Sequence, residues 1–297
     1  MVSIRHMRPD DADAVRALDA LAFAAAAPRT RENVFACLAL NPLGCFVAED
    51  GGPVGYVFSR RWGQVGWVGT FGVHPCRRGR HIGLELLQAA LASLQAAGCT
   101  TIGLETMPDS PYNVGLYARA GFRLTFPTLT LTRRTRPPLR PPPYALLSQV
   151  GEEAGLAAAR QTSLAAWPGL DYGPEAANAR RFAWGQTLLI GWPAPWALAL
   201  VRTAPRREGP AESVADVSAL AVAAPARAQL PQALQAVDAF AADERLGAVR
   251  LAVNASDGAA LQTLLAQGFR VAHVRLRMLL QGESVCPPGV DLSRWAM

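Results

Sequence analysis

The residues with the clearest chemical potential lie between Val73 and Gly83, in the stretch Val-His-Pro-Cys-Arg-Arg-Gly-Arg-His-Ile-Gly. A strand-like run ends at Val73, and a helix-like run extends from Ile82 to Ala97. The amides of the loop and of the first helical turn have no intrahelical acceptors, and they lie at the positive end of the helix dipole. Gly79 lets the backbone approach a ligand closely. The stretch therefore predicts a site for a phosphorylated cofactor, most simply for its pyrophosphate; solvated arginines before an ordinary helix are the alternative.

The bulk composition limits the classes of protein that fit this site. A chain of 297 residues suggests two domains, and 51% hydrophobic against 18% charged residues gives ample material for buried cores. All the basic residues are arginine, which indicates a compositional bias, so a single arginine carries little weight. The net charge of +6 suits an anionic cofactor. Because the charge is spread along the chain without a basic stripe, we expect no nucleic-acid partner.

The cysteines and the apolar runs exclude further classes. No CxxC pair occurs, so we expect neither a metal site nor a disulfide framework, and a reducing, cytoplasmic location follows. The N-terminal residues do not form a signal peptide. The longest uncharged run, residues 186–201, is interrupted by glycine and proline, so we expect no membrane span. The cysteines are Cys37, Cys45, Cys76, Cys99 and Cys286.

The elements around the loop follow from the hydrophobic periodicity and from turn residues. A buried stripe of leucines marks the helix after the loop, and Gly98 ends it. Before the loop we predict strands at 3–7, 45–48, 54–59 and 64–73, with helices from Pro9 and from the N-cap Thr30. After it we predict a strand over Thr101–Thr106, a short helix over 113–120, and strands at 122–126 and 129–133.

A proline-rich segment divides the chain into two similar halves. Residues 136–145 read as a stiff linker, which gives domains at 1–135 and 146–297. The second half repeats the order of elements, and Ala120-Gly121-Phe122-Arg123 aligns with Gln267-Gly268-Phe269-Arg270. A duplicated α/β fold, with an α+β mixed sheet in each copy, is the simplest interpretation.

With these elements in place, residues 3–134 resemble an acetyltransferase of the GNAT superfamily. Three features in the family's order carry the resemblance: Val73-His74-Pro75 with the loop from Arg78 to Gly83, the strand Thr101–Thr106, and a helix that ends in Tyr117-Ala-Arg-Ala-Gly121-Phe122. The resemblance implies two tandem GNAT-like acyl-CoA N-acyltransferase domains, with each sheet splayed between its fourth and fifth strands. It also implies acetyl-CoA, a form of coenzyme A, as co-substrate.

The resemblance assigns residues to the cofactor. The backbone of Phe71, Gly72 and Val73 would hold the pantetheine and the acetyl group. Asn113 would hydrogen-bond the cofactor arm, although it could instead cap its helix. His81 stands where the family usually has glycine, so its side chain could crowd the pyrophosphate, donate to it, or simply lie on the surface. The loop amides that would hold the pyrophosphate belong to Arg78, Gly79, Arg80, His81, Ile82 and Gly83.

Two residues are candidates for proton transfer. Tyr117 lies four residues before Gly121, where the family places a tyrosine that returns a proton to the leaving thiolate. A half-buried core tyrosine is the alternative. Glu105 interrupts an otherwise neutral strand and is a candidate general base, with an ordinary edge carboxylate as the alternative. Thr70 and His74 are the other candidates for the base.

The second half lacks these groups. The loop after Val222 has no glycine and one arginine, and Leu264 stands where Tyr117 would fall. We therefore expect a structural role for this half, or a role in closing the acceptor site. The predicted function is N-acetylation of a small-molecule primary amine by direct attack, in a monomer or homodimer. A protein N-acetyltransferase and an acyl-CoA sensor without turnover are the alternatives.

Overall fold

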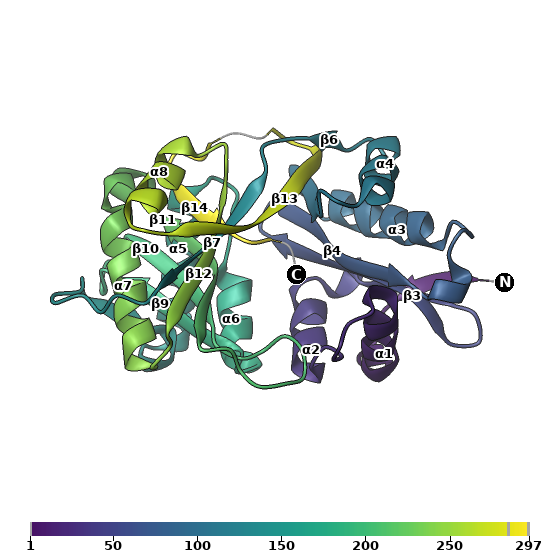
Figure 1. Cartoon of the computed structure of the whole chain (residues 1–297), viewed down its shortest axis with the longest axis horizontal. Coiled ribbons are helices and arrows are strands. Elements are labelled where there is room, and N and C mark those ends of the chain that lie inside the picture. The colour runs from purple at the N-terminus through teal and green to yellow at the C-terminus, as the bar shows by residue number, and fades with distance from the viewer. Residues whose placement is uncertain (1, 284–285, 296–297) are drawn as a thin grey trace.

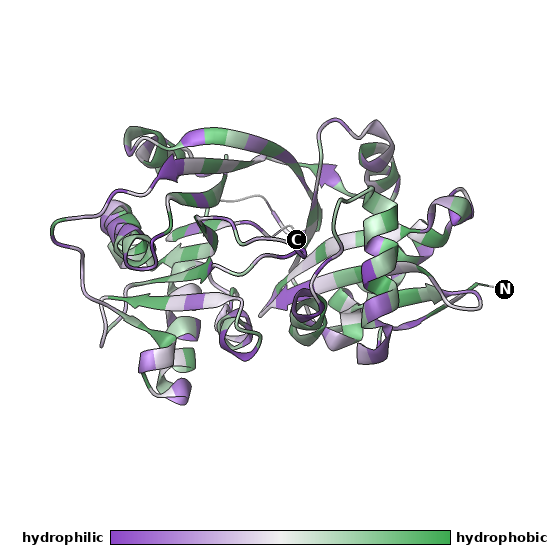
Figure 2. Ribbon diagram, turned by 60° about the horizontal axis from the view of Figure 1, so that its bottom comes forward, coloured by the Kyte–Doolittle hydropathy of each residue, from purple (hydrophilic) through white to green (hydrophobic). Residues whose placement is uncertain are grey.

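A computed structural model describes residues 2–283 and 286–295. Two halves lie side by side, and one 14-stranded sheet runs through both, with helices on both of its faces (Figure 1). The class is mixed α/β, as predicted. Apolar residues concentrate on the strands and on the helix faces that cover them (Figure 2).

The first half begins with a sheet in the order β1-β2-β3-β4-β5. Neighbours are antiparallel except β4 and β5, which are parallel and joined through helix α3. Helices α1 and α2 cover one face of this sheet, and α3 covers the other. The bounds are β1 Ser3–His6, α1 Ala12–Phe23, α2 Arg31–Leu40, β2 Phe46–Glu49, β3 Pro53–Trp62, β4 Val65–Val73, α3 Ile82–Ala96, β5 Thr101–Thr106 and α4 Pro111–Arg119.

The sequence expectations for this half hold in their main features. The Thr30 side chain accepts a hydrogen bond from the amide of Asn33 at 3.1 Å and caps α2, as predicted. Helix α3 buries Leu87 and Leu94 completely, but Leu84 is only half-buried and Leu86 takes its place in the core. A run of leucines in this helix marks the buried stripe, and small shifts in the helix's orientation decide which members it includes.

The second half repeats this plan with β11 and β12 as its parallel pair and α7 between them. Helices α5 and α6 pack on one face of the sheet, and α7 and α8 on the other. The bounds are β8 Tyr144–Leu146, α5 Glu152–Ala166, α6 Gly173–Arg181, β9 Gly185–Ile190, β10 Ala197–Arg202, β11 Val214–Val222, α7 Leu230–Asp243, β12 Ala248–Asn254 and α8 Gly258–Ala266.

The halves exchange strands where they meet. Strand β7 (Thr128–Arg134) belongs to the first half in sequence but pairs with β12 of the second half over its whole length. Strand β13 (Arg270–Gln281) runs from the second half to the first and pairs there with β5 and with β6 (Arg123–Leu124). In Figure 1, β13 is the long yellow ribbon that bridges the two halves. A boundary drawn at residue 135 therefore divides the sequence but not the sheet, and the domain limits remain a prediction.

Each parallel pair opens into a gap, and the two gaps differ. Strands β4 and β5 pair only from Val65 to Val68, and beyond this point β4 continues to Val73 paired with β3 alone. Strands β11 and β12 pair only from Val214 to Asp216. The end of β11 is then covered by β14 (Val290–Ser293), which pairs with it in antiparallel register.

Two expected absences can be compared with the described residues. None of the helices within 2–283 and 286–295 is long and apolar enough to cross a membrane. The same residues contain no group of three or more potential metal ligands.

Candidate active site

The gap between β4 and β5 presents unpaired backbone groups. The amide of His74 donates to the carbonyl of Val54 on β3 at 2.9 Å. Because backbone groups alternate sides along a strand, the amides of Phe71 and Val73 point away from β3, into the gap. A β-bulge between the pairs Val57–Phe71 and Ser59–Val68 twists β4 where the gap begins. The backbone positions assigned to the pantetheine and acetyl group therefore lie along an open strand edge.

The loop between β4 and α3 presents a second set of unpaired amides. Helix α3 starts at Ile82, and its first carbonyl acceptor is that of His81, which receives bonds from Leu84 and Glu85. In the described part of the chain, no acceptor receives the amides of residues 79 to 83. The amide of Arg78 differs, because it donates to the carbonyl of Pro75 at 3.4 Å. Five consecutive donors at a helix N-terminus can bind the oxygens of a pyrophosphate.

The arginines of this loop do not all remain available. Arg77 pairs with Asp50 at 3.0 Å. Arg78 donates from Nη2 to the carbonyl of Ala22, near the end of α1, at 2.8 Å. Arg80 is exposed and has no ion-pair or hydrogen-bond partner among the described residues. Of the three charges, that of Arg80 is the most accessible to an anion.

His81 adopts a left-handed backbone conformation, with φ of 60°. This conformation costs a residue with a side chain roughly 1 kcal/mol relative to glycine. Histidine in place of the family's usual glycine therefore adds backbone strain at the start of α3. The side chain of His81 is exposed, and Gly79, with φ of 78°, has nothing within 4 Å of the position that a Cβ would take.

Tyr117 lies in the wall of the gap. It is 7% exposed, and its ring packs edge-to-face against Phe71 at 6.1 Å and Phe122 at 6.0 Å. Burial raises the pKa of the phenol above its usual value, so the hydroxyl keeps its proton at physiological pH. A Cβ on Gly83 would lie 3.6 Å from Phe71 and 3.7 Å from Val73, which joins the loop to the same wall. Tertiary structure thus brings β4, the loop and α4 together, as the resemblance implied.

Gly72 faces the opposite side of β4. A Cβ at this position would lie 2.9 Å from Ala22 and 3.1 Å from Tyr56. Glycine is required here because α1 packs directly on the strand. Gly72 therefore sets the position of β4, while its neighbours Phe71 and Val73 present their side chains toward α3.

Glu105 lies where the gap begins, one residue beyond Leu104, the last position of β5 that pairs with β4. Its Oε1 atom accepts bonds from Thr128 at 2.6 Å and from Arg277 Nη2 at 3.0 Å. Arg277 comes from β13, stands directly opposite Glu105 in the strand pairing, and lies over the ring of Trp67. The Oε2 atom of Glu105 is buried without a hydrogen-bond partner in the described part of the chain. One carboxylate oxygen thus anchors the exchanged strands, and the other has no hydrogen-bond partner among the described residues.

The remaining candidates take different positions. Helix α4 starts at Pro111, so Asn113 lies within its first turn, half-buried, and does not cap it. Ser110 occupies the cap position without a side-chain hydrogen bond. Thr70 accepts a bond from Arg29 at 2.9 Å, and His74 Nδ1 accepts one from the amide of Cys76 at 3.3 Å. Both candidate bases other than Glu105 are therefore engaged in local structure.

The corresponding place in the second half is filled. Strand β14 lies along the open end of β11, where Ala221 pairs with Asp291 and Val222 with Val290. Arg227 extends over the start of this strand, donates to the carbonyls of Pro287 and Gly289, and pairs with Asp257 at 2.6 Å.

The position that matches Tyr117 in the second half is Leu264, which is fully buried. This side chain has no proton to donate. The second gap is therefore a closed structural unit.

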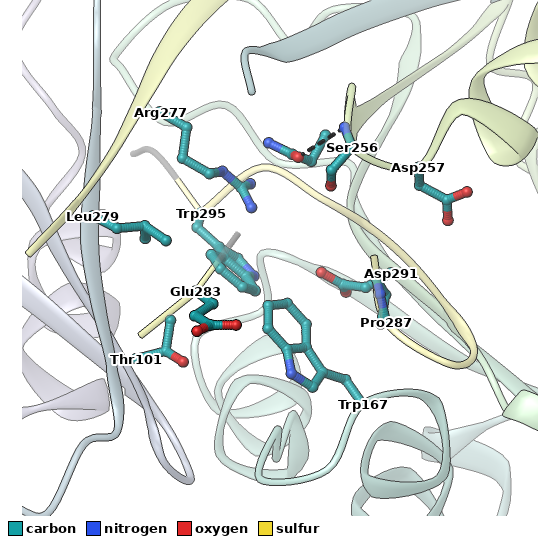
Figure 3. Close-up of a pocket in the computed structure, with 11 residues that line it drawn as sticks. Thr101, Trp167, Ser256, Asp257, Arg277, Leu279, Glu283, Pro287, Asp291 and Trp295 are labelled. Atoms are coloured by element: carbon teal, nitrogen blue, oxygen red, sulfur yellow. Dashed lines mark hydrogen bonds between the residues drawn. The ribbon is translucent and has the colours of Figure 1, made fainter. Parts of the chain in front are cut away.

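A pocket between the halves lies beside β13, whose residues Arg277 and Leu279 line it (Figure 3). Arg277 reaches into it from β13, and Trp167 and Trp295 form one of its walls with ring centroids 5.3 Å apart. It also contains Asp257 and Asp291 of the filled gap. None of the loop residues from 71 to 83 contributes to this pocket, so it is distinct from the predicted cofactor site.

These observations define a protein with one open and one filled gap, and the open gap presents unpaired backbone amides along a strand edge and at a helix start. Residues 12–122 match the acetyltransferase (GNAT) family. This match lies within the first half, and the chain as a whole has the tandem form of the GNAT fold.

Solved structures share the fold of the whole chain. A candidate acetyltransferase from Pyrococcus horikoshii is 17% identical with a TM-score of 0.73, over 99% of this chain and 95% of that one. A GCN5-related N-acetyltransferase from Sphaerobacter thermophilus is 17% identical with a TM-score of 0.60, over 100% and 98%. A tandem GNAT protein from the clavulanic acid biosynthesis pathway is 17% identical with a TM-score of 0.59, over 96% and 100%. At these identities the likeness establishes the fold.

Proposed function

We propose that the protein transfers the acetyl group of acetyl-CoA to a primary amine of a small molecule, in the gap between β4 and β5. The observation that carries this proposal is the set of unpaired amides at Phe71, Val73 and residues 79–83. They form two groups, one along the strand edge and one at the helix start. An acyl thioester bound along the strand, with its pyrophosphate at the helix, satisfies both groups.

Tyr117 acts as the general acid in this proposal. A buried phenol with a raised pKa remains protonated, so it can donate to the sulfur as the carbon–sulfur bond breaks. The amine attacks the thioester carbon directly and loses a proton. Glu105 Oε2, the oxygen without a partner, accepts this proton directly or through water. An amide of β4 facing the gap stabilises the negative charge that develops on the carbonyl oxygen.

The second half closes the acceptor side of the first. The loop between β10 and β11 reaches the connection between α1 and α2 (Figure 1). There the amide of Thr30 donates to the carbonyl of Arg206 at 3.0 Å, and the amide of Glu208 donates to the carbonyl of Pro28 at 2.9 Å. The acceptor enters between the two halves. Through this contact the degenerate second half forms one side of the entrance.

The test of this function is release of free CoA from acetyl-CoA in the presence of a broad panel of primary amines. Tyr117→Phe should lower kcat by about 100-fold with little change in the KM of acetyl-CoA, since the hydroxyl acts on the leaving sulfur. The matched control is Tyr112→Phe, in the same helix, whose side chain is 70% exposed. Wild-type activity should show no loss from phenol deprotonation up to about pH 10, because the pKa of Tyr117 is raised above its usual value.

Two outcomes would contradict the proposal. If acetyl-CoA does not raise the melting temperature, the cofactor assignment is wrong. If acetyl-CoA binds but no amine in the panel releases CoA, the sensor alternative replaces the enzyme. Equal kcat in Tyr117→Phe and Tyr112→Phe would remove the general acid from the mechanism.

A further inference from the structure

The carboxylate of Glu105 is held by two strands that pack with the second half, and the proposed mechanism gives these strands no role. Its Oε1 atom accepts a bond from the hydroxyl of Thr128 at 2.6 Å. It also accepts bonds from Nη2 and Nε of Arg277, at 3.0 Å and 3.2 Å. A carboxylate oxygen has about two lone-pair sites, so three donors leave Oε1 with no further capacity to accept.

The guanidinium of Arg277 is itself held in place. It lies over two indole rings, 5.1 Å from the centroid of Trp67 and 4.7 Å from that of Trp295. Its Nε also donates to the hydroxyl of Thr128 at 3.1 Å. Contact with aromatic faces and several bonds to one acceptor restrict the orientation of a guanidinium. Arg277 therefore holds Glu105 as part of an ordered buried group, and its side chain is only 7% exposed.

Both donors depend on the second half for their position. Thr128 begins β7, which pairs with β12 along its whole length. Arg277 lies in β13, which follows α8 in the chain and brings this side chain directly opposite Glu105. The second half therefore supplies or supports both groups that orient the carboxylate.

The second half contains the equivalent strand pair without the charges. Counted from the Gly-Phe-Arg sequence that both halves share, Ala252 matches Glu105 and Thr130 matches Arg277. Ala252 and Thr130 stand opposite each other in the pairing of β12 with β7, as Glu105 and Arg277 do in the pairing of β5 with β13. The hydroxyl of Thr130 is buried without a hydrogen-bond partner within the described ranges.

This internal comparison argues against a purely structural role for the charged pair. Strand β7 pairs with β12 over all seven of its residues although alanine and threonine occupy the matching positions. Replacing a buried ion pair by less polar residues is often neutral or stabilising. Strand exchange therefore does not require the charged pair, which occurs beside the open gap and not at the matching positions beside the filled one.

Glu105 also lies on the acceptor side of the sheet. Ile102 and Leu104 pack in the core that contains α3, and side chains alternate along a strand, so Glu105 faces the opposite surface. Thr70 on β4 faces this surface too, because its hydroxyl accepts a bond from Arg29. Helices α1 and α2 lie on this surface, next to the entrance in the proposed function.

We propose that Arg277 and Thr128 are positioning residues for the general base, which occupy Oε1 of Glu105 and direct the proton of the attacking amine to Oε2. This inference rests on the proposed function, in which Glu105 is the base. The amine nitrogen bonds the thioester carbon, and its N–H proton passes to Oε2 directly or through one water. The carbon–sulfur bond breaks, and the thiolate takes the proton of Tyr117. Return of the proton from Glu105 to the Tyr117 phenolate through solvent restores both groups.

Two threonines of β7 give the cleanest test. Thr128→Val removes the hydroxyl bonded to Oε1, and Thr130→Val removes a hydroxyl without a partner among the described residues. Both side chains are buried, so the two changes alter packing alike. Thr128→Val should lower kcat for CoA release about tenfold, the effect of one hydrogen bond to a charged group, with the KM of both substrates within about twofold. Thr130→Val should match wild type, and Thr128→Ser should restore kcat.

A double-mutant cycle separates positioning from a structural role. Glu105→Gln keeps an oxygen for the three donors and places an amide nitrogen where Oε2 lies, so it removes the base and retains the contacts. It should lower kcat about 100-fold. Thr128→Val added to Glu105→Gln should change kcat by less than about twofold, because the hydroxyl acts only through the carboxylate.

The same cycle applies to the arginine. Arg277→Lys keeps the buried charge but loses the planar group that bonds Oε1 twice, so kcat should fall about tenfold in the wild-type background and less than about twofold in Glu105→Gln. The matched control is Arg275→Lys, two residues earlier on β13, which should behave as wild type.

The outcomes separate this inference from the proposed function. If the wild type releases no CoA with any amine, both are wrong. If the wild type is active and Glu105→Gln keeps its kcat, acetyl transfer stands, but the base and its positioning residues are wrong. The inference alone is overturned if Thr128→Val and Thr130→Val have equal kcat. It is also overturned if Thr128→Val lowers kcat equally with and without Glu105→Gln, since its effect is then structural.

Discussion

The loop after β4 and the loop after β11 start from the same plan and end in different states. Both follow a nine-residue strand, and both carry an arginine five residues after the strand's last residue, Arg78 in one and Arg227 in the other. In the first half the strand edge and the helix start remain open. In the second half β14 covers the strand edge, and Arg227 is held by carbonyls and a carboxylate of its own domain.

This difference shows how a segment of the chain itself can fill a gap of this kind. The antiparallel strand β14 supplies hydrogen bonds to β11 along the edge that corresponds to the open edge of β4. Arg227 holds the segment before β14 in place through the carbonyls of Pro287 and Gly289. The first gap differs because the strand next to β5, β13, comes from the other half and lies on the side away from β4. Strand exchange therefore completes the sheet and leaves the gap between β4 and β5 free.

The comparison predicts opposite consequences for the two arginines. Arg227→Met should lower the free energy of unfolding by about 3 kcal/mol, because it leaves Asp257, whose side chain is 4% exposed, without its partner. Arg78→Met should change the free energy of unfolding by less than about 0.5 kcal/mol. It should weaken CoA binding several-fold. Denaturant unfolding measures the stability of each variant, and calorimetric titration measures its affinity for CoA. If the two substitutions lowered CoA affinity equally, the second gap would also be a binding site.

The glycine of the open loop gives a smaller contrast. Gly79→Ala places a side chain at φ of 78°, which costs about 1 kcal/mol and disturbs the amides next to it. We expect the Kd of CoA to rise about tenfold, since the binding groups are those amides. The reverse change at the matching position, Ala228→Gly, should leave the Kd unchanged. A tenfold effect of Ala228→Gly would mean that the second loop contributes to the cofactor site.

The smallest predicted effect is at His81. His81→Gly relieves a left-handed conformation but adds flexibility to the unfolded chain, so the melting temperature should change little or rise by a few degrees. Affinity for CoA should stay within about twofold, because His81 contributes its amide, which glycine retains. A large loss of affinity would show that the imidazole itself donates to the pyrophosphate.

Much of the candidate site could be read from the sequence because it is local. The strand, the glycine-containing loop and the helix that follows lie within a short segment, and hydrophobic period and turn residues determine their order. Tyr117 could be predicted from its place before Gly121-Phe122. Local sequence also indicated that the second loop, without glycine, is no copy of the first. In each case the relevant interactions are between near neighbours in the chain.

Tertiary structure decided the rest, because it depends on contacts between distant segments. The partner of Glu105 is Arg277, 172 residues later, and no periodicity in either segment indicates the pair. Strand β14 could not be assigned to the second gap, since a four-residue strand can pair with any open edge. Local sequence is enough to predict one loop for an anionic cofactor, because its strand, turn and helix are neighbours in the chain. Which gap stays open depends on β13 and β14, which reach the two gaps from distant segments.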